Sequence, residues 1–428
     1  MQADELIMVS VDDHVVEPPH LFEGRMPAKF ADRAPRVVRR EDGADVWMFE
    51  GGVIPNLGLN AVAGRPREEF GVDPVAYDEM RAGCFDIHER IKDMNAGGVL
   101  GSMCFPSFPS FTGRLFSAIA DKDVALAVIQ AYNDWHIDEW CGTHPGRFIP
   151  LALPVLWDAD LAAAELRRVA AKGCRALTFS ENPSLLGLPS FHNPYWDPVW
   201  RAASDEGVVI SIHLGSSGQV PTTSPDAPVD VGITLMPMNV CQAAADIVWS
   251  RVPRQFPEIR FALSEGSTGW IPYFLDRIDR AYELHRAWTG QDFGDETPSV
   301  VFRRHFLTCF IVDPVGVLLR EHIGIDNVAW ECDFPHADSL WPHSPEEFAE
   351  VTAGIPDAHV AKMSYENACR WYSFDPFVHR PKERCTVGAL RAEAAGHDVS
   401  IRSYDKGRYA QAGVAGMSLD QLAARSTL

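Results

Sequence analysis

A carboxylate and an imidazole follow an apolar run near the start of the chain. Residues 6–11 are mostly apolar, and Asp12, Asp13 and His14 come directly after them. Side chains two residues apart on a strand point to the same face, so Asp12 and His14 would leave the strand end together, about 6–7 Å apart at ~3.3 Å per residue. This arrangement would supply half of a metal site or an acid/base pair.

Three later apolar runs end in the same kinds of side chain. His213, Glu265 and Asp333 each stand at the end of such a run, and His336 follows three residues after Asp333. A mixture of carboxylates and imidazoles suits Zn²⁺, Mn²⁺ or Fe²⁺, which can polarise a carbonyl or activate a bound water. We therefore predict a divalent metal ion at this place. The candidate ligands are Asp12, His14, His213, Glu265 and Asp333, with His336 as a weaker candidate, and the candidate catalytic residues are Glu265, Asp333 and His336.

The elements that must position these residues alternate between strand and helix. Short apolar runs, which predict strands buried on both faces, are followed by helical segments. Eight such units predict an α/β protein with a closed (β/α)8 TIM barrel, in which the carboxyl ends of all strands meet at one face. An open doubly wound sheet is disfavoured because no Gly-x-Gly-x-x-Gly follows a strand. The predicted strands are 6–11, 99–105, 148–153, 175–179, 208–214, 259–264, 305–311 and 327–332, and the predicted helices are 85–96, 117–140, 158–172, 193–206, 238–251, 270–288, 313–322 and one or two within 345–371.

Two segments fall outside this alternation. Residues 20–80 are rich in Pro, Gly and Arg, and predict a long irregular loop inserted after the first strand. The pattern also stops near residue 375, which gives a barrel domain over 1–375 and a C-terminal arm over 376–428. We expect this arm to form an oligomer contact or to be partly disordered.

The overall charge limits the partners of the protein. The chain of 428 residues has a net charge of −21, which argues against nucleic acid or an anionic membrane as a partner. No run approaches the ~18–20 apolar residues of a membrane span, and the acidic N-terminus lacks the basic start of a secretory signal. Nine cysteines without a CxxC pair indicate reduced thiols. These features predict a cytoplasmic protein that acts on a small molecule.

Several other polar residues are weaker candidates for the site. Asp13 would point away from Asp12 and is expected to be a supporting partner. His305 stands near the start of its strand and is expected to be structural, whereas Glu17 remains a minor candidate. The residues on predicted helices that are given no role are His88, Glu89 and His136.

The substrate pocket is only weakly indicated. Four aromatic residues near predicted strand ends could wall an apolar pocket, and two arginines in the insertion could bind a carboxylate. The aromatic residues are Phe105, Phe108, Trp270 and Trp341, and the arginines are Arg65 and Arg67.

An ordered set of motifs resembles those of the amidohydrolase-related family typified by aminocarboxymuconate-semialdehyde decarboxylase and γ-resorcylate decarboxylase, within the amidohydrolase superfamily. The resemblance runs from about residue 6 to residue 375. The matching motifs are Val11-Asp12-Asp13-His14 with Glu17-Pro18, the segments 86–94, 148–151 and 191–200, Val209-Ile210-Ser211-Ile212-His213, Glu265-Gly266-Ser267-Thr268-Gly269-Trp270 and Glu331-Cys332-Asp333-Phe334-Pro335-His336.

The resemblance implies a distorted (β/α)8 barrel with a metal held by Asp12, His14, His213 and Asp333. Members of this family hydrolyse C–N or C–O bonds, or decarboxylate aromatic and unsaturated acids, usually without an organic cofactor. Two positions depart from the decarboxylases. Asp12 stands where they more often have His or Glu, and Glu265 stands where they place a catalytic His.

Three functions follow as hypotheses. The first is a metal-dependent hydrolase or lyase that acts on a small organic, carboxylate-bearing substrate, with Glu265 as general acid or base. The second is a dinuclear non-haem Fe or Mn/Fe oxygenase, because the acidic site resembles that of some relatives. In this hypothesis the site holds two metal ions, and Glu265 and His336 are ligands of the second ion. The third is an inactive partner subunit, which the intact ligand set argues against. The expected assembly is a homo-oligomer, dimeric or larger, with a hetero-oligomer as the alternative.

Overall fold

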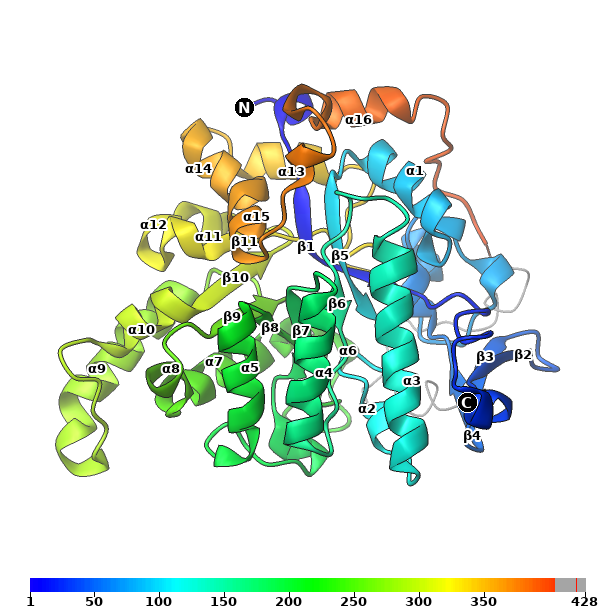
Figure 1. Ribbon diagram of the computed structural model, residues 1–428. Coiled ribbons are helices and arrows are strands. Elements are labelled where there is room, and N and C mark those ends of the chain that lie inside the picture. Colours follow the sequence, from blue (N-terminus) through cyan, green and yellow to red (C-terminus); the bar gives the residue numbers. More distant parts are fainter. Residues whose placement is uncertain (405–420, 422–428) are drawn as a thin grey trace.

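Eight parallel strands form the centre of the fold. The computed structural model describes residues 1–404 and 421. Each strand residue except Arg260 is buried, because neighbouring elements cover both faces of the strands. In Figure 1, β1 and β5 lie side by side at the centre of the molecule, with β10 and β11 to their left. They are β1 (Val9–Val15), β5 (Gly101–Pro106), β6 (Leu151–Ala152), β7 (Ala176–Ser180), β8 (Val209–His213), β9 (Arg260–Ser264), β10 (Phe306–Phe310) and β11 (Val328–Trp330).

Hydrogen bonding divides these strands into a pair, β1 with β5, and a six-stranded sheet in the order β11-β10-β9-β8-β7-β6. Two short contacts join the parts. A bridge between Ser102 and Phe148 links β5 toward β6, and the Asp333 N–H donates to the Asp12 carbonyl at 2.8 Å beside β11. The predicted fold, a distorted (β/α)8 barrel, is confirmed.

Helices follow most of the strands, with ends that the sequence marks clearly. The carboxylates of Asp86, Asp121 and Asp158 each accept backbone N–H groups at a helix start, and Gly207 ends its helix in the left-handed conformation. The helices are α1 (Ile87–Gly97), α2 (Arg114–Ser117), α3 (Lys122–Trp135), α4 (Ala159–Ala171), α5 (Asp197–Glu206), α6 (Val229–Leu235), α7 (Met238–Trp249), α8 (Val252–Gln255), α9 (Ile271–Thr289), α10 (Pro298–His305), α11 (Pro314–Leu318), α12 (Arg320–Ile323), α13 (Ser344–Val351), α14 (Asp357–Ala361), α15 (Asn367–Trp371) and α16 (Val387–Glu393).

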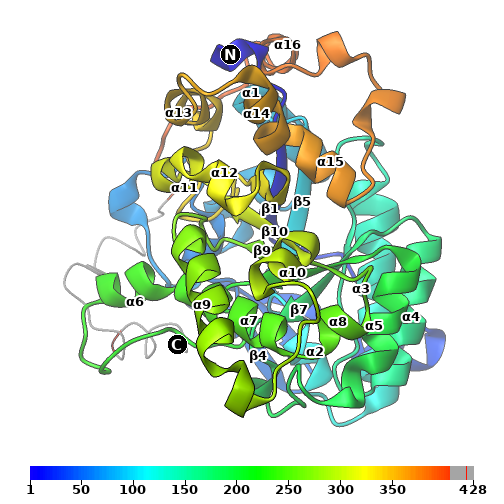
Figure 2. The same cartoon turned by 90° about the vertical axis from the view of Figure 1, so that its left-hand side faces the viewer.

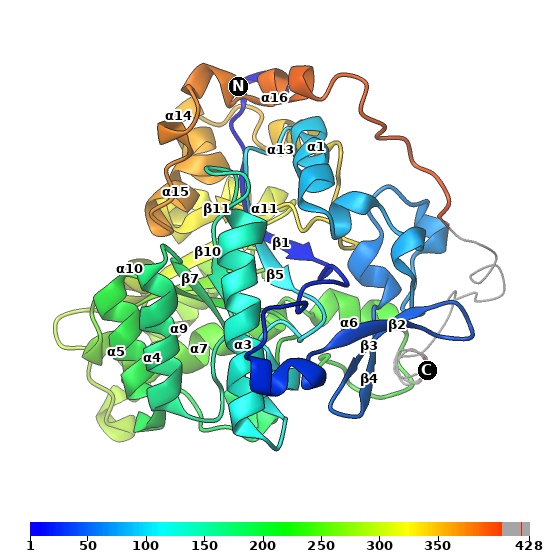
Figure 3. The same ribbon diagram turned by 45° about the vertical axis from the view of Figure 1, so that its right-hand side comes forward.

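The insertion after β1 is more regular than predicted. It contains an antiparallel sheet of β2 (Arg36–Arg39), β3 (Asp45–Phe49) and β4 (Gly52–Pro55), which lies at the edge of the molecule in Figure 3. The expectation of an irregular loop was wrong here, because strands of four or five residues between turns carry too little alternation to be recognised. The insertion also reaches the candidate site: the N–H groups of Val62 and Ala63 both donate to the Pro335 carbonyl, at 3.0 and 3.2 Å.

The first part of the C-terminal arm packs against its own barrel. Helix α16 contacts α1, and the Val387 N–H donates to the Leu6 carbonyl at 2.8 Å. Helices α13 to α16 gather at the end of the molecule where the N-terminus lies (Figure 2). The remainder of the arm, 405–420 and 422–428, lies outside the described residues, so its predicted role as an oligomer contact or disordered tail stays a prediction.

One stretch is more apolar than the sequence analysis expected. Within the part of the chain that the structure describes, Val229–Trp249 is long and apolar enough to cross a membrane by length and composition. Pro237 separates its two helices, α6 and α7, and α7 buries Val240, Ala244 and Ile247 against the barrel. This burial is typical of a helix that covers the core of a folded domain, and a single such stretch is weak evidence for a membrane span.

Candidate metal centre

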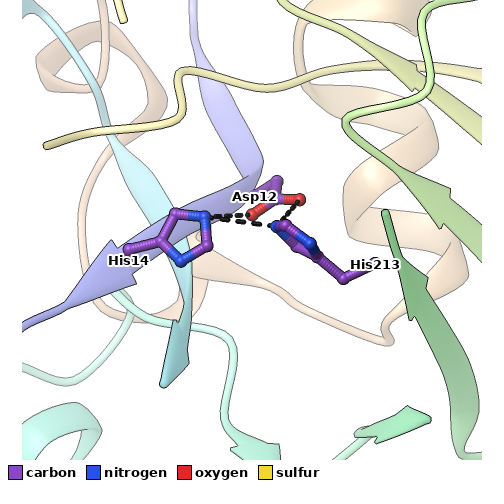
Figure 4. Close-up of side chains that lie close together, drawn as sticks. All are labelled: Asp12, His14 and His213. Carbon is purple, nitrogen blue, oxygen red and sulfur yellow. Dashed lines mark hydrogen bonds and ion pairs between the residues drawn. The ribbon is translucent and has the colours of Figure 1, made fainter. Parts of the chain in front are cut away.

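Asp12 and His14 from β1 and His213 from the end of β8 point toward one another (Figure 4). Asp12 and His14 lie within β1 itself, beside a break in its pairing register with β5 between Ser10 and Asp13. The two Nε2 atoms of His14 and His213 are 3.3 Å apart, and each lies 3.5 Å from a carboxylate oxygen of Asp12. All three side chains are fully buried.

Two more carboxylates complete the group. Oδ1 of Asp333, just after β11, lies 3.2 Å from His14 Nε2, and Oε2 of Glu265, just after β9, lies 3.3 Å from His213 Nε2. Five side chains from four strands therefore gather at the carboxyl end of the barrel. The donor atoms of Asp12, His14 and His213 all lie within 4.8 Å of one another, and Asp333 and Glu265 each contact one of the two histidines. Carboxylates and imidazoles in this number suit a divalent metal ion.

The two carboxylates that follow β9 and β11 stand on strained backbone. Glu265 has φ of 59° and Asp333 has φ of 57°, in the left-handed region that side-chain-bearing residues rarely adopt. The Glu265 N–H donates to Oε2 of Glu331 at 3.1 Å, and the Asp333 N–H donates to the Asp12 carbonyl at 2.8 Å. These bonds hold the two turns so that both carboxylates face the histidines, and such strain is typical of functional sites.

The histidines are poised as neutral ligands. Nδ1 of His213 donates to the Leu214 carbonyl at 2.6 Å, which fixes the tautomer and leaves a lone pair on Nε2 toward the site. Burial lowers the pKa of His213 to about 4. Burial likewise lowers the pKa of His14 well below its ordinary value, and the neighbouring imidazoles of His336 and His213 add to this effect. Only a neutral imidazole can bind a metal, so both residues have the required form.

The carboxylates fit a cation equally well. Neither oxygen of Asp12 or of Asp333 has a hydrogen-bond partner among the residues described, although both side chains are fully buried. Burial, together with the nearby carboxylate of Glu265, raises the pKa of Asp12 and of Asp333 well above the ordinary value. Burial also raises the pKa of Glu265 to about 8, with a smaller contribution from Asp338. A divalent cation would supply both the missing partners and the missing charge.

His336 lies beside this group. Its ring stacks on that of His14 with a centroid distance of 3.5 Å, and its Nδ1 lies 3.3 Å from Asp333 Oδ1. His14, Asp333 and His336 thus form a second set of donors that shares His14 with the first. The side chains of His336 and Glu265 are 12% and 15% exposed, whereas the other ligands are fully buried, so a substrate would reach the site along this edge.

Aromatic rings wall the inner side of the site. The ring centroid of Phe111 lies 4.2 Å from that of His213 and 5.2 Å from that of His14. The ring centroid of Phe105 lies 4.8 Å from that of His213. Phe105 was predicted, and Phe111 was not, because it belongs to the loop after β5 and has no strand-end signal. Such apolar walls exclude water and strengthen electrostatic interactions inside the site.

The other predicted pocket residues lie elsewhere. Phe108 stacks on Trp47 at 4.4 Å, and the Trp341 indole packs against Phe334 and donates to the Asp93 carbonyl. Trp270 donates to the Gly266 carbonyl at the start of α9. Within residues 1–404, none of these three rings contacts a histidine ring of the site, so their role as pocket walls stays a prediction. Arg65 is buried and donates to the Glu79 carbonyl, while Arg67 is exposed, and their role as a carboxylate clamp stays a prediction.

A supporting layer lies behind the histidines. Asp13 accepts hydrogen bonds from Ser102 Oγ and from the Phe334 N–H, the latter at 3.0 Å, which agrees with its predicted supporting role. Arg90, which the sequence analysis did not single out, is buried and donates to the His14 carbonyl at 2.6 Å. Glu331 was also missed, although its spacing from Asp333 repeats that of Asp12 and His14.

The histidines outside the site are structural or exposed. His305 is buried at the end of α10, where Nδ1 donates to the Ile259 carbonyl at 2.7 Å, as predicted. His136 is buried in the π-helical turn after α3, and burial lowers its pKa to about 4. His88 lies exposed beside His144, and its neighbour Glu89 pairs with Lys92.

Glu17 is a structural residue of the loop between β1 and the insertion. Its buried carboxylate accepts the N–H groups of Ser107 and Phe108, at 3.0 and 2.8 Å, and the Tyr132 hydroxyl at 3.0 Å. Burial raises the pKa of Glu17 to about 7, and these three donors partly oppose that rise. Glu17 therefore anchors the loop after β5, which carries Phe111, to the end of β1.

The first testable prediction concerns this anchor. We expect Glu17→Ala to lower the free energy of unfolding by about 3 kcal/mol, because three buried donors lose their acceptor. Urea unfolding followed by circular dichroism measures the change. Glu89→Ala, at an exposed carboxylate on α1, is the control and should change stability by less than about 0.5 kcal/mol. A Glu17→Ala protein as stable as the control would show that water replaces the carboxylate at no cost.

Comparisons with known proteins place the chain in a family. A family profile described as amidohydrolase matches residues 26–374. A γ-resorcylate decarboxylase from Rhodococcus jostii (strain RHA1) is 26% identical over 328 residues, which cover 72% of this chain and 94% of that protein. The chain therefore belongs to the amidohydrolase family, and it is an enzyme.

Solved structures agree on the fold. The 5-carboxyvanillate decarboxylase of Sphingomonas paucimobilis matches with a TM-score of 0.61 at 19% identity, covering 86% of this chain and 100% of that one. A dihydroxybenzoic acid decarboxylase from Polaromonas sp. JS666, solved with bound manganese and the inhibitor 2-nitroresorcinol, matches with a TM-score of 0.57 at 17% identity, covering 89% and 99%.

The predicted resemblance to the decarboxylase-like branch of the amidohydrolase superfamily is confirmed. Membership of an enzyme family argues against the inactive partner subunit. The relatives named above are decarboxylases, so they lend no support to the dinuclear oxygenase.

Proposed function

We propose that this enzyme is a metal-dependent carboxy-lyase that removes CO₂ from a small aromatic acid, of the hydroxybenzoate type that its relatives act on. The observation that carries the proposal is the convergence of Asp12, His14, His213, Asp333 and Glu265 at the carboxyl ends of the barrel strands. The similarity to γ-resorcylate decarboxylases directs the choice of reaction.

We propose that Asp12, His14, His213 and Asp333 hold the metal ion. Manganese is the first choice, because a relative of the same fold was solved with it and because the donor set is rich in carboxylate oxygen. Zn²⁺ and Fe²⁺ are the alternatives. When bound, the ion acts as a Lewis acid toward the oxygens of the substrate.

The residues at the exposed edge would manage the proton. Decarboxylation breaks the bond between the ring carbon and the carboxyl carbon, leaves the bonding pair on the ring, and requires a proton to form the new C–H bond. Glu265 and His336 are the partly exposed side chains of this group, and the buried Nε2 of His336 has no hydrogen-bond partner among the residues described. Both side chains are therefore placed to deliver a proton to a bound substrate. Asp333 would then serve as a ligand first, and its predicted catalytic role would be secondary.

Hydrolysis of a C–N or C–O bond is the second candidate. Glu265 favours it, since this carboxylate stands close to those of Asp12 and Asp333 and would repel a substrate carboxylate more strongly than a histidine would. In a hydrolase the same side chain would act as base toward a water molecule.

The second testable prediction combines metal content with an activity assay. Protein purified without added metal or chelator should contain about one divalent ion per chain, chiefly manganese, by element-resolved mass spectrometry. Manganese-loaded enzyme should release CO₂ from a panel of dihydroxybenzoates, and dialysis against a chelator should abolish release until Mn²⁺ is returned. Turnover of esters or amides without CO₂ release would establish the hydrolase instead. Two iron ions per chain with oxygen uptake would contradict both.

We also propose that the enzyme functions in the cytoplasm as a homo-oligomer. All nine cysteines are free thiols, as is typical of proteins in a reducing compartment.

A further inference from the structure

A positively charged cavity lies at the opposite end of the barrel from the candidate metal centre. Its volume is about 440 Å³, and Arg147, Arg380, Arg384 and Glu393 are the charged side chains that line it, together with two histidines. Nε of Arg147 donates to the Leu100 carbonyl, directly before β5 begins, at 2.6 Å. The cavity is therefore at the amino ends of the strands, whereas the candidate site is at their carboxyl ends.

Arg147 forms the base of this cavity. Its side chain is buried, and besides Leu100 it donates through Nη2 to Asn95 Oδ1 at 2.8 Å and to the Val99 carbonyl at 3.1 Å. Nη1 has no hydrogen-bond partner within residues 1–404. Burial lowers the pKa of Arg147 to about 10, and Arg380 adds to the decrease by repulsion, so the guanidinium is still charged at neutral pH.

The other two guanidiniums come from the C-terminal arm. Arg380 lies just before the short helix η13 (Lys382–Arg384), and Arg384 is its last residue. Both donate to the same oxygen, Oε1 of Glu393 on α16. Among the residues described, three guanidiniums and one carboxylate thus line the cavity, and His144 and His379 can only add positive charge. This local excess stands out in a chain whose net charge is −21.

We propose that this cavity binds a small oxyanion, a phosphate group or a dicarboxylate, which fastens the C-terminal arm to the base of the barrel. Guanidinium groups recognise such anions through paired charge-assisted hydrogen bonds, and the volume is in the range of small-molecule sites. The amino face of a barrel contributes to stability and not to chemistry, so the anion is a structural or regulatory ligand, separate from the substrate.

Binding of inorganic phosphate to the full-length, metal-loaded enzyme tests the proposal. Isothermal titration calorimetry at constant ionic strength, with chloride as the reference anion, should detect one saturable phosphate site per chain. This site should still be detected when the metal centre holds its ion. Arg384→Gln should weaken binding by about tenfold or more, because it removes a charged donor. This side chain is 63% exposed, so the variant should fold. Arg380→Gln should have the same effect.

Glu393→Gln should change the affinity for phosphate in the opposite direction. It removes the one carboxylate of the cavity and releases both arginines, so phosphate should bind about tenfold more tightly. Arg167→Gln is the matched control, because Arg167 also bonds two carboxylates, Asp205 and Glu206, but lies on α4 away from the cavity. Its affinity for phosphate should equal that of the parent enzyme.

A parallel titration with succinate identifies the source of the oxyanion. Binding of phosphate alone assigns a phosphate ligand, and binding of succinate alone assigns a dicarboxylate. Either result, with the expected response of the Arg384→Gln and Glu393→Gln variants, supports the proposal. Absence of binding for both probes, or equal affinities in all variants, overturns it.

Discussion

The His213→Asn variant should lose its bound divalent metal and at least about a thousandfold in turnover, the rate equivalent of several kcal/mol of Lewis-acid stabilisation. Asparagine retains a donor near the position of Nδ1, so the hydrogen bond to the Leu214 carbonyl can persist. The variant lacks an equivalent of Nε2, the atom that faces His14, Asp12 and Glu265. The expected defect is therefore loss of a ligand, with the local backbone contact retained.

Metal content per chain and the rate of CO₂ release should both be measured on freshly purified protein. His305→Asn is the matched control. His305 is also buried and also donates from Nδ1 to a backbone carbonyl, that of Ile259, but it lies directly before β10, at the amino end of the strand. This variant should keep its metal and its rate even if its stability falls. A His213→Asn enzyme with full metal and full rate would remove His213 from the site, and equal metal loss in both variants would indicate general unfolding.

Much of this site could be predicted because the barrel makes strand ends informative. Buried parallel strands are continuous apolar runs, so the polar residue that ends each run is conspicuous, as His213 and Asp333 are. Asp12 and His14 can be recognised for the same reason, because they directly follow an apolar run. The structure brings these residues together as predicted, whereas their role as ligands stays a prediction until metal is measured.

Contacts made through loops and backbone geometry were beyond sequence reasoning. Phe111 reaches both histidines from an irregular loop, which has no periodicity to place it. The left-handed backbone of Glu265 depends on a tertiary hydrogen bond to Glu331, and no local pattern indicates that bond. The three short strands of the insertion were missed for a different reason, because runs of four or five residues carry too little alternation to be recognised.

Glu265→Gln should retain the metal and lose about a hundredfold or more in turnover, the usual contribution of a proton-transferring side chain. Glutamine preserves the size of the side chain and the backbone bond to Glu331, but it removes the exchangeable proton and the negative charge. In Glu265→Gln the rate of CO₂ release should therefore fall while the metal content stays unchanged. In His213→Asn both quantities should fall.

This separation also decides how many ions the site holds. If Glu265 binds a second ion, as the acidity of the site suggested from the sequence, the variant should lose one of two metal equivalents. His336→Asn tests the same point with a second residue, because Nδ1 of His336 lies 3.3 Å from Asp333 Oδ1 and its ring stacks on that of His14. Loss of one ion in both variants would establish a dinuclear centre. Unchanged metal with reduced rate in both would assign Glu265 and His336 to proton transfer, which is the outcome expected if four buried ligands suffice for one ion.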